Sequence, residues 1–320
     1  MRSLNALRPL FRGPLVLLAA LVLLAGCQST TLTADGLMQP SRPIAAAAYG
    51  AVERRGHSAL VVDYQSGRTL FADQADDLRY PASLTKLMTL YLVFEQLESG
   101  RLSMNDQLLV SANAASKPPS KLGVEAGETI PVSLAVQALA TKSANDVATI
   151  VAENLAGSES AFAAVMTAKA RALGMNRTRF ANASGLPDPG QISTARDMTI
   201  LARALMSRFP EYLPVFAVPS YEYRGKTYRS TNKLLGKVAG VDGLKTGYIN
   251  DAGSHLVATV KRGGRRLIVV VLGTIYTGVA TPSEAAAFGA VGAFLIAATA
   301  ESRSLVVELS AELRLPVAIR

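Results

Sequence analysis

The sequence contains few of the side chains on which many protein sites depend, with one cysteine and two histidines among 320 residues. A single cysteine cannot form a disulfide within the chain or build a cysteine-based metal site, so the stability of the fold must come from packing. The histidines, His57 and His255, lie at the start of one strand-like run and within another. Because each position is typical of a structural histidine, a Ser-His-Asp triad is not favoured.

The chain also has few charges, since charged residues make up 18% of it and hydrophobic residues 49%. This balance excludes a disordered chain and indicates a globular protein with one substantial core. The formal net charge is +9, yet the basic residues are spread along the chain, without an arginine-rich block or a basic segment interleaved with aromatics. Nucleic acid is therefore not expected as a partner.

The N-terminus has the pattern of an export signal. Three arginines precede an apolar run of 12 residues that ends at Gly26. Such a run is too short to span a bilayer but fits the hydrophobic region of a signal peptide. Cys27 follows directly, and this arrangement resembles the lipobox of bacterial lipoproteins, in which the cysteine is acylated and becomes the new N-terminus. The alternative is a thiol without a role inside a discarded peptide.

We therefore expect residues 1–27 to be a lipoprotein signal peptide with Cys27 lipidated. The protein would then be anchored to a membrane on the periplasmic side of the bacterial cell envelope. Residues 28–55 contain Ser, Thr, Pro and Ala without a hydrophobic period, which is typical of a tether. The globular domain is expected over residues 56–302, followed by a short C-terminal extension at 303–320.

Hydrophobic periodicity predicts strands near both ends of the globular domain and helices between them. One antiparallel sheet built from both ends, covered by helices and carrying an inserted all-helical region, is an α+β fold. A polar segment punctuated by Pro and Gly, 109–129, is predicted to be a long surface loop. The predicted strands are 57–64, 68–72, 241–248, 254–262 and 265–273, and the predicted helices are 83–100, 131–140, 146–155, 159–173 and one that begins near 193–197.

A last helix is predicted to begin at the capping box Thr281-Pro282-Ser283-Glu284 and to end near Ala300. It contains 16 residues, 285–300, without a charge. This stretch is short and rich in alanine and glycine for a membrane span. A helix lying against the sheet is therefore favoured over the alternative of a transmembrane segment.

Ser83 and Lys86 form an S-x-x-K pair at the start of a predicted helix. Residues three apart on a helix share a face, so the lysine amine would lie beside the serine hydroxyl and could act as the base for its attack on a carbonyl. A lysine keeps its proton at pH 7 unless burial or a neighbouring cation lowers its pKa. The alternative is an ordinary helix start, with Ser83 as the N-cap and Lys86 in solvent. Ser230 and Lys233 repeat the same spacing.

Two further motifs supply what a serine acyl-transfer site needs besides a base. Ser143-Ala144-Asn145 falls at the break between two predicted helices, where a turn could point both polar side chains into a cleft. Lys245-Thr246-Gly247 lies in a predicted strand, where its glycine would let a substrate approach the backbone. A second S-x-N copy, Ser111-Ala112-Asn113, lies in the polar loop and is the weaker candidate.

The order S-x-x-K, S-x-N, K-T-G is typical of serine β-lactamases and penicillin-binding proteins. Around these motifs stand the blocks RYPASLTKLMT, VSANAASKPPSKLG, KSANDVA, FANASGLPDPGQISTARDM, STNKLL and VDGLKTGY. With them, the chain resembles the low-molecular-mass penicillin-binding proteins, the serine-type D-Ala-D-Ala carboxypeptidases, over about residues 55–275. The resemblance implies the fold that these peptidases share with the β-lactamases, and a hydrolase that needs no metal and no cofactor.

The resemblance also implies a reaction and a role for each site residue. Ser83 would attack the carbonyl of the penultimate D-Ala of a peptidoglycan stem peptide with Lys86 as base, and water would then hydrolyse the acyl-enzyme. β-Lactam antibiotics would imitate this substrate. The resemblance further implies that the N–H groups of Ser83 and Tyr248 hold the oxyanion, and that Ser143 passes a proton to the leaving amine. Asn145 would orient the substrate amide, and Gly247 would let the substrate approach closely. Thr246, with the charge of Lys245, would bind the terminal carboxylate.

The sequence departs from the pattern of this family in three places. Only 47 residues follow Gly273, so we expect no β-rich second domain and no C-terminal membrane helix, whose place the acylated Cys27 would take. Tyr248 stands where many relatives carry a histidine. No arginine closely follows residues 269–273 (VVVLG), at the end of the last predicted strand. The residue that would bind the substrate carboxylate together with Thr246 and Lys245 is therefore left open.

Three other functions remain open on these motifs. A DD-endopeptidase that cuts peptidoglycan cross-links would use the same site. A β-lactamase would be expected to carry an E-x-x-L-N segment for deacylation, which the sequence lacks. A non-catalytic peptidoglycan-binding lipoprotein would be expected to have lost Ser83 or Lys86, and both are present.

Overall fold

The computed structural model describes residue 52 and residues 56–250, 252–262 and 264–273. The predicted signal peptide with Cys27, all but residue 52 of the predicted tether, the predicted last helix and the predicted C-terminal extension lie outside these residues. In the described part of the chain, no helix is both long and apolar enough to cross a membrane.

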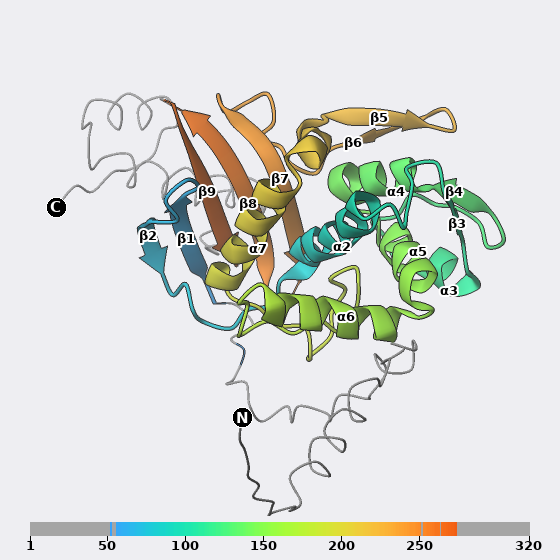
Figure 1. Ribbon diagram of the computed structural model, residues 1–320, viewed down its shortest axis with the longest axis horizontal. Helices are drawn as coiled ribbons and strands as arrows, with labels where there is room; N and C mark the ends of the chain where they lie inside the picture. The colour runs from blue at the N-terminus through green and yellow to red at the C-terminus, as the bar shows by residue number, and fades with distance from the viewer. Residues whose placement is uncertain (1–51, 53–55, 251, 263, 274–320) are drawn as a thin grey trace, which may run out of the picture. The chain divides into compact units, whose positions relative to one another are not determined.

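A five-stranded sheet with the strand order β2-β1-β9-β8-β7 forms one side of the fold (Figure 1). Neighbouring strands are antiparallel, and β1 lies between β2 and β9, with Leu60 opposite Val270. The prediction of one antiparallel sheet built from both ends of the domain is therefore confirmed. The strands are β1 (Ser58–Asp63), β2 (Thr69–Asp73), β7 (Val241–Ile249), β8 (Gly253–Arg262) and β9 (Arg265–Leu272).

Both faces of the sheet are apolar, and this explains why β1 has a continuous hydrophobic sequence. Every residue of β1 is buried. Leu60 and Val62 belong to the larger hydrophobic core, whereas Ala59 and Val61 belong to a second cluster. Because successive side chains of a strand point to opposite faces, each cluster covers one face of the sheet. A strand covered on both faces loses the alternation of polar and apolar residues.

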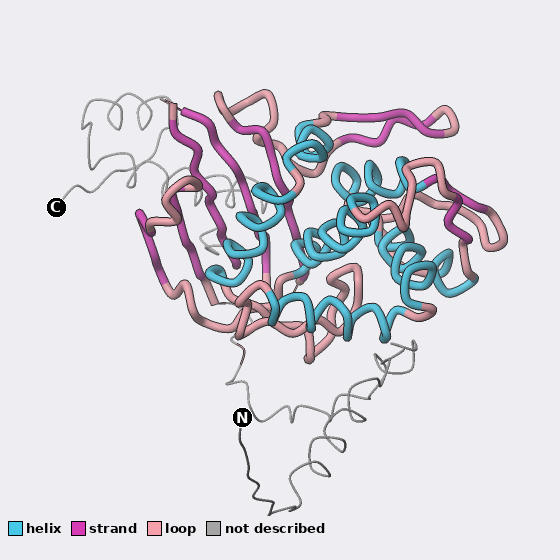
Figure 2. Tube along the Cα trace, in the orientation of Figure 1, coloured by secondary structure: helices cyan, strands magenta, loops and turns pink. Residues whose placement is uncertain are grey.

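The helices gather on one side of the sheet, and α2 is buried among them (Figure 2). Residues 86–94 of α2 are all buried, because α5, α6 and α7 pack against it. The predicted helix over 83–100 is confirmed, although its first turn, Ala82–Thr85, is a 3-10 helix. The helices are α2 (Lys86–Glu98), α3 (Ala112–Ser116), α4 (Val132–Gln137), a π-helical turn (Ala138–Lys142), α5 (Asn145–Ala156), α6 (Glu159–Ala172), α7 (Ala195–Arg208) and a second 3-10 helix (Pro210–Ala217).

The prediction of a long surface loop over 109–129 is confirmed only in part, because the segment also contains a helix and both of its ends belong to strands. The segment begins at the end of β3 (Gln107–Leu109), contains α3, and ends at the start of β4 (Thr129–Pro131). Strands β3 and β4 pair with each other in an antiparallel hairpin. The polar and proline-rich composition of the segment therefore concealed a small folded unit.

The second half of that segment is fixed by a buried carboxylate and not by regular secondary structure. Leu122 and Val124 are buried, so their backbone groups need partners inside the protein. The N–H groups of Leu122 and Gly123 donate to the Asp146 carboxylate at 3.0 and 2.8 Å. The segment is thus attached to the first turn of α5.

A further hairpin, which the sequence did not reveal, packs on the same segment. It consists of β5 (Ser220–Tyr223) and β6 (Lys226–Arg229). The rings of Tyr221 and Tyr228 stack with their centroids 5.3 Å apart. The Tyr228 hydroxyl donates to the Leu122 carbonyl at 2.7 Å, so the hairpin supports the segment from the other side.

Candidate active site

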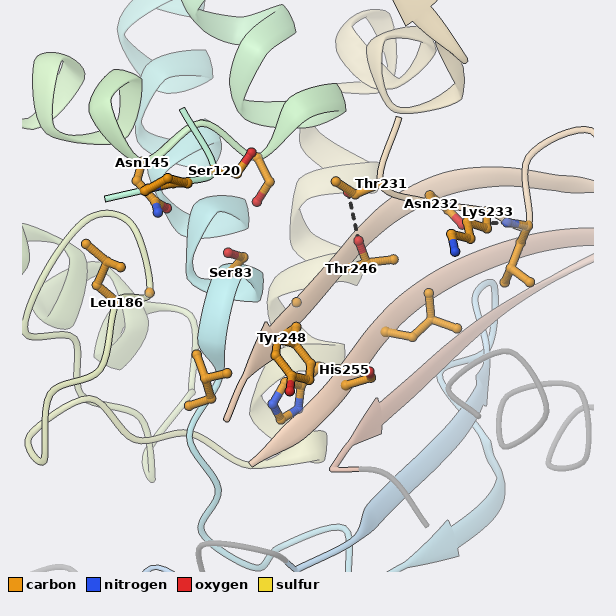
Figure 3. A pocket seen from close by; sticks show the side chains of 18 residues that line it. Ser83, Ser120, Asn145, Leu186, Thr231, Asn232, Lys233, Thr246, Tyr248 and His255 are labelled. Atoms are coloured by element: carbon orange, nitrogen blue, oxygen red, sulfur yellow. Dashed lines mark hydrogen bonds between the residues drawn. The ribbon is translucent and has the colours of Figure 1, made fainter. Parts of the chain in front are cut away.

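A cleft of about 620 Å³ opens between the 3-10 turn that precedes α2, the junction before α5, and strand β7 (Figure 3). Three stretches that are far apart in the sequence meet there. Further walls come from the residues around Ser120, Leu186 and Asn232. The sequence-predicted residues that line the cleft are Ser83, Ser143, Asn145, Thr246, Gly247 and Tyr248.

Ser83 lies on the 3-10 turn that precedes α2. The residues that cap this turn and α2, Pro81 and Thr85, make no side-chain capping hydrogen bond, and Ser83 holds neither position. Lys86 is 0% exposed, and its Nζ lies 3.2 Å from Ser83 Oγ. The alternative of a capping serine and a solvated lysine is therefore wrong for both residues.

The other two neighbours of the Lys86 amine can only accept hydrogen bonds. Its Nζ lies 2.8 Å from Asn145 Oδ1 and 2.5 Å from the carbonyl oxygen of Ser184. The Asn145 amide keeps this orientation because its Nδ2 donates to the Pro118 carbonyl at 3.0 Å. A neutral amine has two N–H groups and one lone pair. When both N–H groups are donated to these oxygens, the lone pair is left for the proton of the Ser83 hydroxyl.

Two buried lysines lie at this site, and burial favours the neutral form of each. Burial lowers the pKa of Lys86 well below its usual value, and the positive charge of Lys245 lowers it further. Negative charges on Asp146 and Glu159 act on the Lys86 pKa in the opposite direction. Burial also lowers the pKa of Lys245, to about 7. Lys86 can therefore act as a base near neutral pH, while Lys245 keeps part of its positive charge.

The turn between the π-helical residues and α5 places Ser143 in the cleft. Ser143 has a φ of +63°, in the left-handed region that residues other than glycine rarely adopt. Its side chain is buried, and its Oγ has no hydrogen-bond partner among the described residues. A strained backbone and an unpaired buried hydroxyl are both features of functional sites. Ser143 is therefore placed to exchange a proton with a group bound beside Ser83.

Two glycines allow other parts of the chain to approach the backbone of Ser83. A Cβ atom on Gly247 would lie 3.1 Å from the Ser83 nitrogen. A Cβ atom on Gly185, which has a φ of +84°, would lie 1.9 Å from the Ala82 carbonyl oxygen and 2.9 Å from the Ser83 nitrogen. The loop that contains Gly185 can therefore approach the Ser83 N–H only because this position lacks a side chain, and the absence of a side chain at Gly247 lets strand β7 approach without a tight contact.

The K-T-G motif points successive side chains to opposite faces of β7. Lys245 is buried, and its Nζ donates to the Thr246 carbonyl at 2.8 Å. Thr246 lines the cleft and donates its hydroxyl proton to Thr231 Oγ1 at 2.8 Å (Figure 3). Tyr248 is 54% exposed. Every site residue predicted within the described residues thus lies at or directly behind one cleft.

The second S-x-N copy is not part of this cleft and has a structural role. Ser111 is the N-cap of α3, where its Oγ accepts a hydrogen bond from Ala114 N–H at 2.9 Å. The Ser111 hydroxyl and the Asn113 amide both donate to the carboxylate of Glu153. The structure therefore brings residues 143–145 to Ser83 and uses residues 111–113 to attach α3 to α5.

Neither histidine is hydrogen-bonded to Ser83 in the described structure. His255 lines the cleft, but its Nδ1 accepts from Gly273 N–H at 2.9 Å, and burial lowers its pKa to about 3. His57 Nε2 lies 3.6 Å from Asp73 at the beginning of β1. Among the described residues, no group of three or more His, Cys, Asp or Glu side chains could hold a metal ion.

Two contributors to the site were missed by sequence reasoning. Ser184 takes part through its carbonyl oxygen, and a backbone carbonyl has no residue type by which it could be recognised. Gly185 is required by a close approach of two chain segments, which becomes visible only when both are folded. The only available signal was the Ser-Gly pair within the block FANASGLPDPG.

Comparison with known proteins supports the grouping suggested by these motifs. A family model described as D-alanyl-D-alanine carboxypeptidase matches residues 45–275. The chain is 36% identical over 233 residues to the D-alanyl-D-alanine carboxypeptidase DacF of Bacillus subtilis, covering 71% of this chain and 58% of that protein. It is 34% identical over 223 residues to DacA of Escherichia coli, covering 68% and 55%. The chain thus spans little more than half the length of these two curated relatives.

The fold is also found in solved structures. Penicillin-binding protein D2 of Listeria monocytogenes in its cefotaxime-bound form superimposes with a TM-score of 0.64 at 31% sequence identity, over 78% of this chain and 98% of that one. The resemblance in motifs is therefore matched by a resemblance in architecture. The chain belongs to the D-alanyl-D-alanine carboxypeptidase family, whose model covers residues 45–275.

Proposed function

We propose that this protein is a serine D-Ala-D-Ala carboxypeptidase, which removes the terminal D-Ala from peptidoglycan stem peptides through an acyl-enzyme at Ser83. The observation that carries the proposal is the buried amine of Lys86. It lies 3.2 Å from Ser83 Oγ, and its other two partners, Asn145 Oδ1 and the Ser184 carbonyl, accept its N–H groups. This arrangement supplies a neutral base for a serine nucleophile without a histidine.

The reaction then proceeds in two halves. Ser83 Oγ attacks the carbonyl carbon of the penultimate D-Ala while its proton passes to Lys86 Nζ, and the backbone N–H groups of Ser83 and Tyr248 donate to the resulting oxyanion. The C–N bond breaks as Ser143 gives its proton to the leaving amine and regains one from the protonated Lys86, so that the amine departs as D-Ala and Lys86 is neutral again. A water molecule then attacks the ester on Ser83 and releases the shortened stem peptide.

The remaining cleft residues hold the substrate in place. The Asn145 amide orients the peptide bond before the scissile one, and Gly247 lets the peptide lie close to β7. Thr246 receives the terminal carboxylate when its hydroxyl turns from Thr231 Oγ1 to the ligand, and Lys245 adds positive charge behind it. β-Lactams present a strained amide and a carboxylate in a similar arrangement, so we propose that they acylate Ser83 and are inhibitors of this protein.

Mass spectrometry of purified muropeptides tests the proposed reaction. Incubation with a monomeric muropeptide that carries a pentapeptide stem should remove one D-Ala from it, and Ser83→Ala should leave the muropeptide unchanged. A cross-linked dimer with tetrapeptide stems is the second substrate. If the wild-type protein cleaves the dimer and not the pentapeptide, the protein is a DD-endopeptidase and the carboxypeptidase proposal is wrong.

We further propose that Cys27 carries the lipid that attaches the protein to a membrane. An acyl chain contributes about 0.8 kcal/mol per buried methylene, so one chain binds only marginally and two anchor a protein stably. The wild-type protein should therefore take up a palmitate analogue during growth and remain in the membrane fraction in high salt, which screens charge-based attachment. Cys27→Ser should take up no label.

The tether proposed at 28–55 separates this anchor from the cleft. Purified Cys27→Ser protein should therefore react with penicillin at the wild-type rate. A wild-type protein that takes up no palmitate analogue, or whose mature N-terminus lies after Cys27, would contradict the lipid anchor and leave the proposed reaction unaffected.

A further inference from the structure

The segment between β6 and β7 forms the end of the cleft that lies beyond Thr246. In Figure 3, Asn232 and Lys233 lie beyond Thr246 on the side away from Ser83, and Thr231 lies above Thr246, to which a hydrogen bond joins it. Thr231 is fixed from two directions, because its N–H donates to the Thr141 carbonyl at 3.1 Å and its Oγ1 accepts from Thr246 at 2.8 Å. This end of the cleft is therefore a defined part of the site.

Asn232 presents a buried hydrogen-bond donor that no described residue accepts. Its side chain is 5% exposed. Its Oδ1 accepts from Leu234 N–H at 3.1 Å, and this bond fixes which end of the amide is oxygen and which is nitrogen. The Nδ2 atom is buried without a partner in the described structure. Because an unpaired buried donor is costly, such a group in a native protein calls for a specific partner.

Lys233 adds a positive charge beside this donor. Its side chain is exposed and lines the cleft, and it makes no hydrogen bond or ion pair with any residue that the structure describes. Among the described residues that line the cleft there is no aspartate and no glutamate. Lys245 lies buried directly behind Thr246. This end of the cleft therefore presents donors and positive charge to a ligand and nothing that would repel an anion.

We infer that Asn232 and Lys233 bind the carboxylate of the leaving residue, together with Thr246. The inference rests on the proposed function, in which Thr246 receives the terminal carboxylate. It names two further residues that would bind this carboxylate, whose partner the sequence left open. A carboxylate has two oxygens and about four lone-pair directions, so Thr246 alone cannot satisfy it. Asn232 Nδ2 supplies a fixed donor, and Lys233 supplies a mobile cation that can follow the ligand.

Paired substrates that differ only at the carboxylate test this inference. The first pair is N-acetylated L-Lys-D-Ala-D-Ala and its C-terminal amide. Lys233→Gln should lower kcat/KM for the acid about tenfold, as expected for loss of a partly exposed charge-assisted contact, and should change kcat/KM for the amide less than about twofold. Lys237→Gln is the matched control, because Lys237 is also exposed, lies four residues further on, and does not line the cleft.

Asn232→Asp provides a second variant with nearly the same shape. The Oδ1 acceptor for Leu234 N–H is kept, while the Nδ2 donor becomes a carboxylate oxygen that repels an anionic ligand. The loss in kcat/KM for the acid should exceed the loss for the amide, and the ratio of the two values reports on the subsite even if the variant is less stable. Equal losses for both substrates would overturn the role of Asn232.

Benzylpenicillin and its methyl ester form a second pair that separates this inference from the proposed function. In one outcome the wild type hydrolyses the peptide acid, and Lys233→Gln has the same rates as Lys237→Gln with both pairs of compounds. The inferred carboxylate subsite is then wrong, and the proposed carboxypeptidase activity is supported. In another outcome the wild type hydrolyses neither peptide, but Lys233→Gln slows acylation by benzylpenicillin about tenfold and does not slow acylation by the methyl ester. The inferred carboxylate subsite is then supported, and the proposed carboxypeptidase activity is wrong. If the wild type reacts with none of the four compounds, both are overturned.

Discussion

Replacing Ser83 with alanine is expected to abolish covalent labelling of the protein by a fluorescent penicillin. The hydroxyl of Ser83 lies 3.2 Å from the amine of Lys86 and is the proposed acceptor of the penicilloyl group. Gel fluorescence after incubation, with the intact mass of the adduct, measures the reaction. Labelling of Ser83→Ala at the wild-type rate would show that another residue is the nucleophile.

Three companion variants establish the roles around Ser83. Lys86→Ala should slow labelling by about 10² to 10⁴-fold, the usual contribution of a general base.

Ser143→Ala should lose peptide hydrolysis, whereas Ser111→Ala should keep it and lose only about 1 kcal/mol of unfolding free energy, because Ser111 caps α3. Equal losses of activity in the two serine variants would mean that the structural distinction between the S-x-N copies has no catalytic meaning.

Gly185→Ala is expected to remove acylation almost as completely, although Gly185 carries no reactive group. A methyl group at this position would lie 1.9 Å from the Ala82 carbonyl oxygen and 2.9 Å from the Ser83 nitrogen, so the Ala82–Ser83 peptide must move. The Ser83 N–H is a proposed oxyanion donor, and loss of one such donor slows acyl transfer about 10² to 10³-fold. The measurement is the second-order rate of acylation by benzylpenicillin, with thermal unfolding in parallel.

Gly174→Ala is the matched control for this variant. Gly174 has a φ of +88°, close to the +84° of Gly185, but a Cβ atom there would meet nothing within 4 Å. Both variants place a Cβ atom at a similar positive φ, which costs roughly 1–2 kcal/mol, and only one displaces the Ser83 peptide. Acylation of Gly174→Ala should therefore remain near the wild-type rate. If the two variants lose acylation in parallel, the effect of Gly185→Ala is one of stability and not of position.

The fold could be predicted from sequence wherever local pattern and tertiary burial agree. The continuous apolar run of β1 and the repeating apolar residues of α2 specify a strand buried on both faces and a buried helix. Over 109–129 the prediction missed the short helix α3 and the pairing of β3 with β4. It also could not show that the N–H groups of Leu122 and Gly123 donate to Asp146, 24 and 23 residues further along the chain. Likewise, the β5–β6 hairpin depends on the stacking of Tyr221 on Tyr228, which becomes apparent only after folding.

The candidate site could be predicted to the extent that its chemistry lies in side chains with a fixed order in the sequence. The residues of the S-x-x-K, S-x-N and K-T-G motifs meet at one cleft. The choice between the two S-x-N copies was possible because one lies at a break between apolar helices. The carbonyl of Ser184 and the backbone approach at Gly185 could not be predicted, since each depends on position and not on residue type.

The position of β1 between β2 and β9 has a consequence for the order in which the protein folds. Ser58 pairs with Leu272, so the sheet closes only after almost the whole described chain has been synthesised. Contacts between residues so distant in sequence form slowly, because the entropy of closing the intervening loop is lost first. The helices from α2 to α7 can form earlier from local contacts. A growing chain that ends before β9 leaves an open edge on β1, which is free to pair with another chain. The cleft is therefore completed late, when β9 joins the two parts of the sheet and β7 is held beside Ser83.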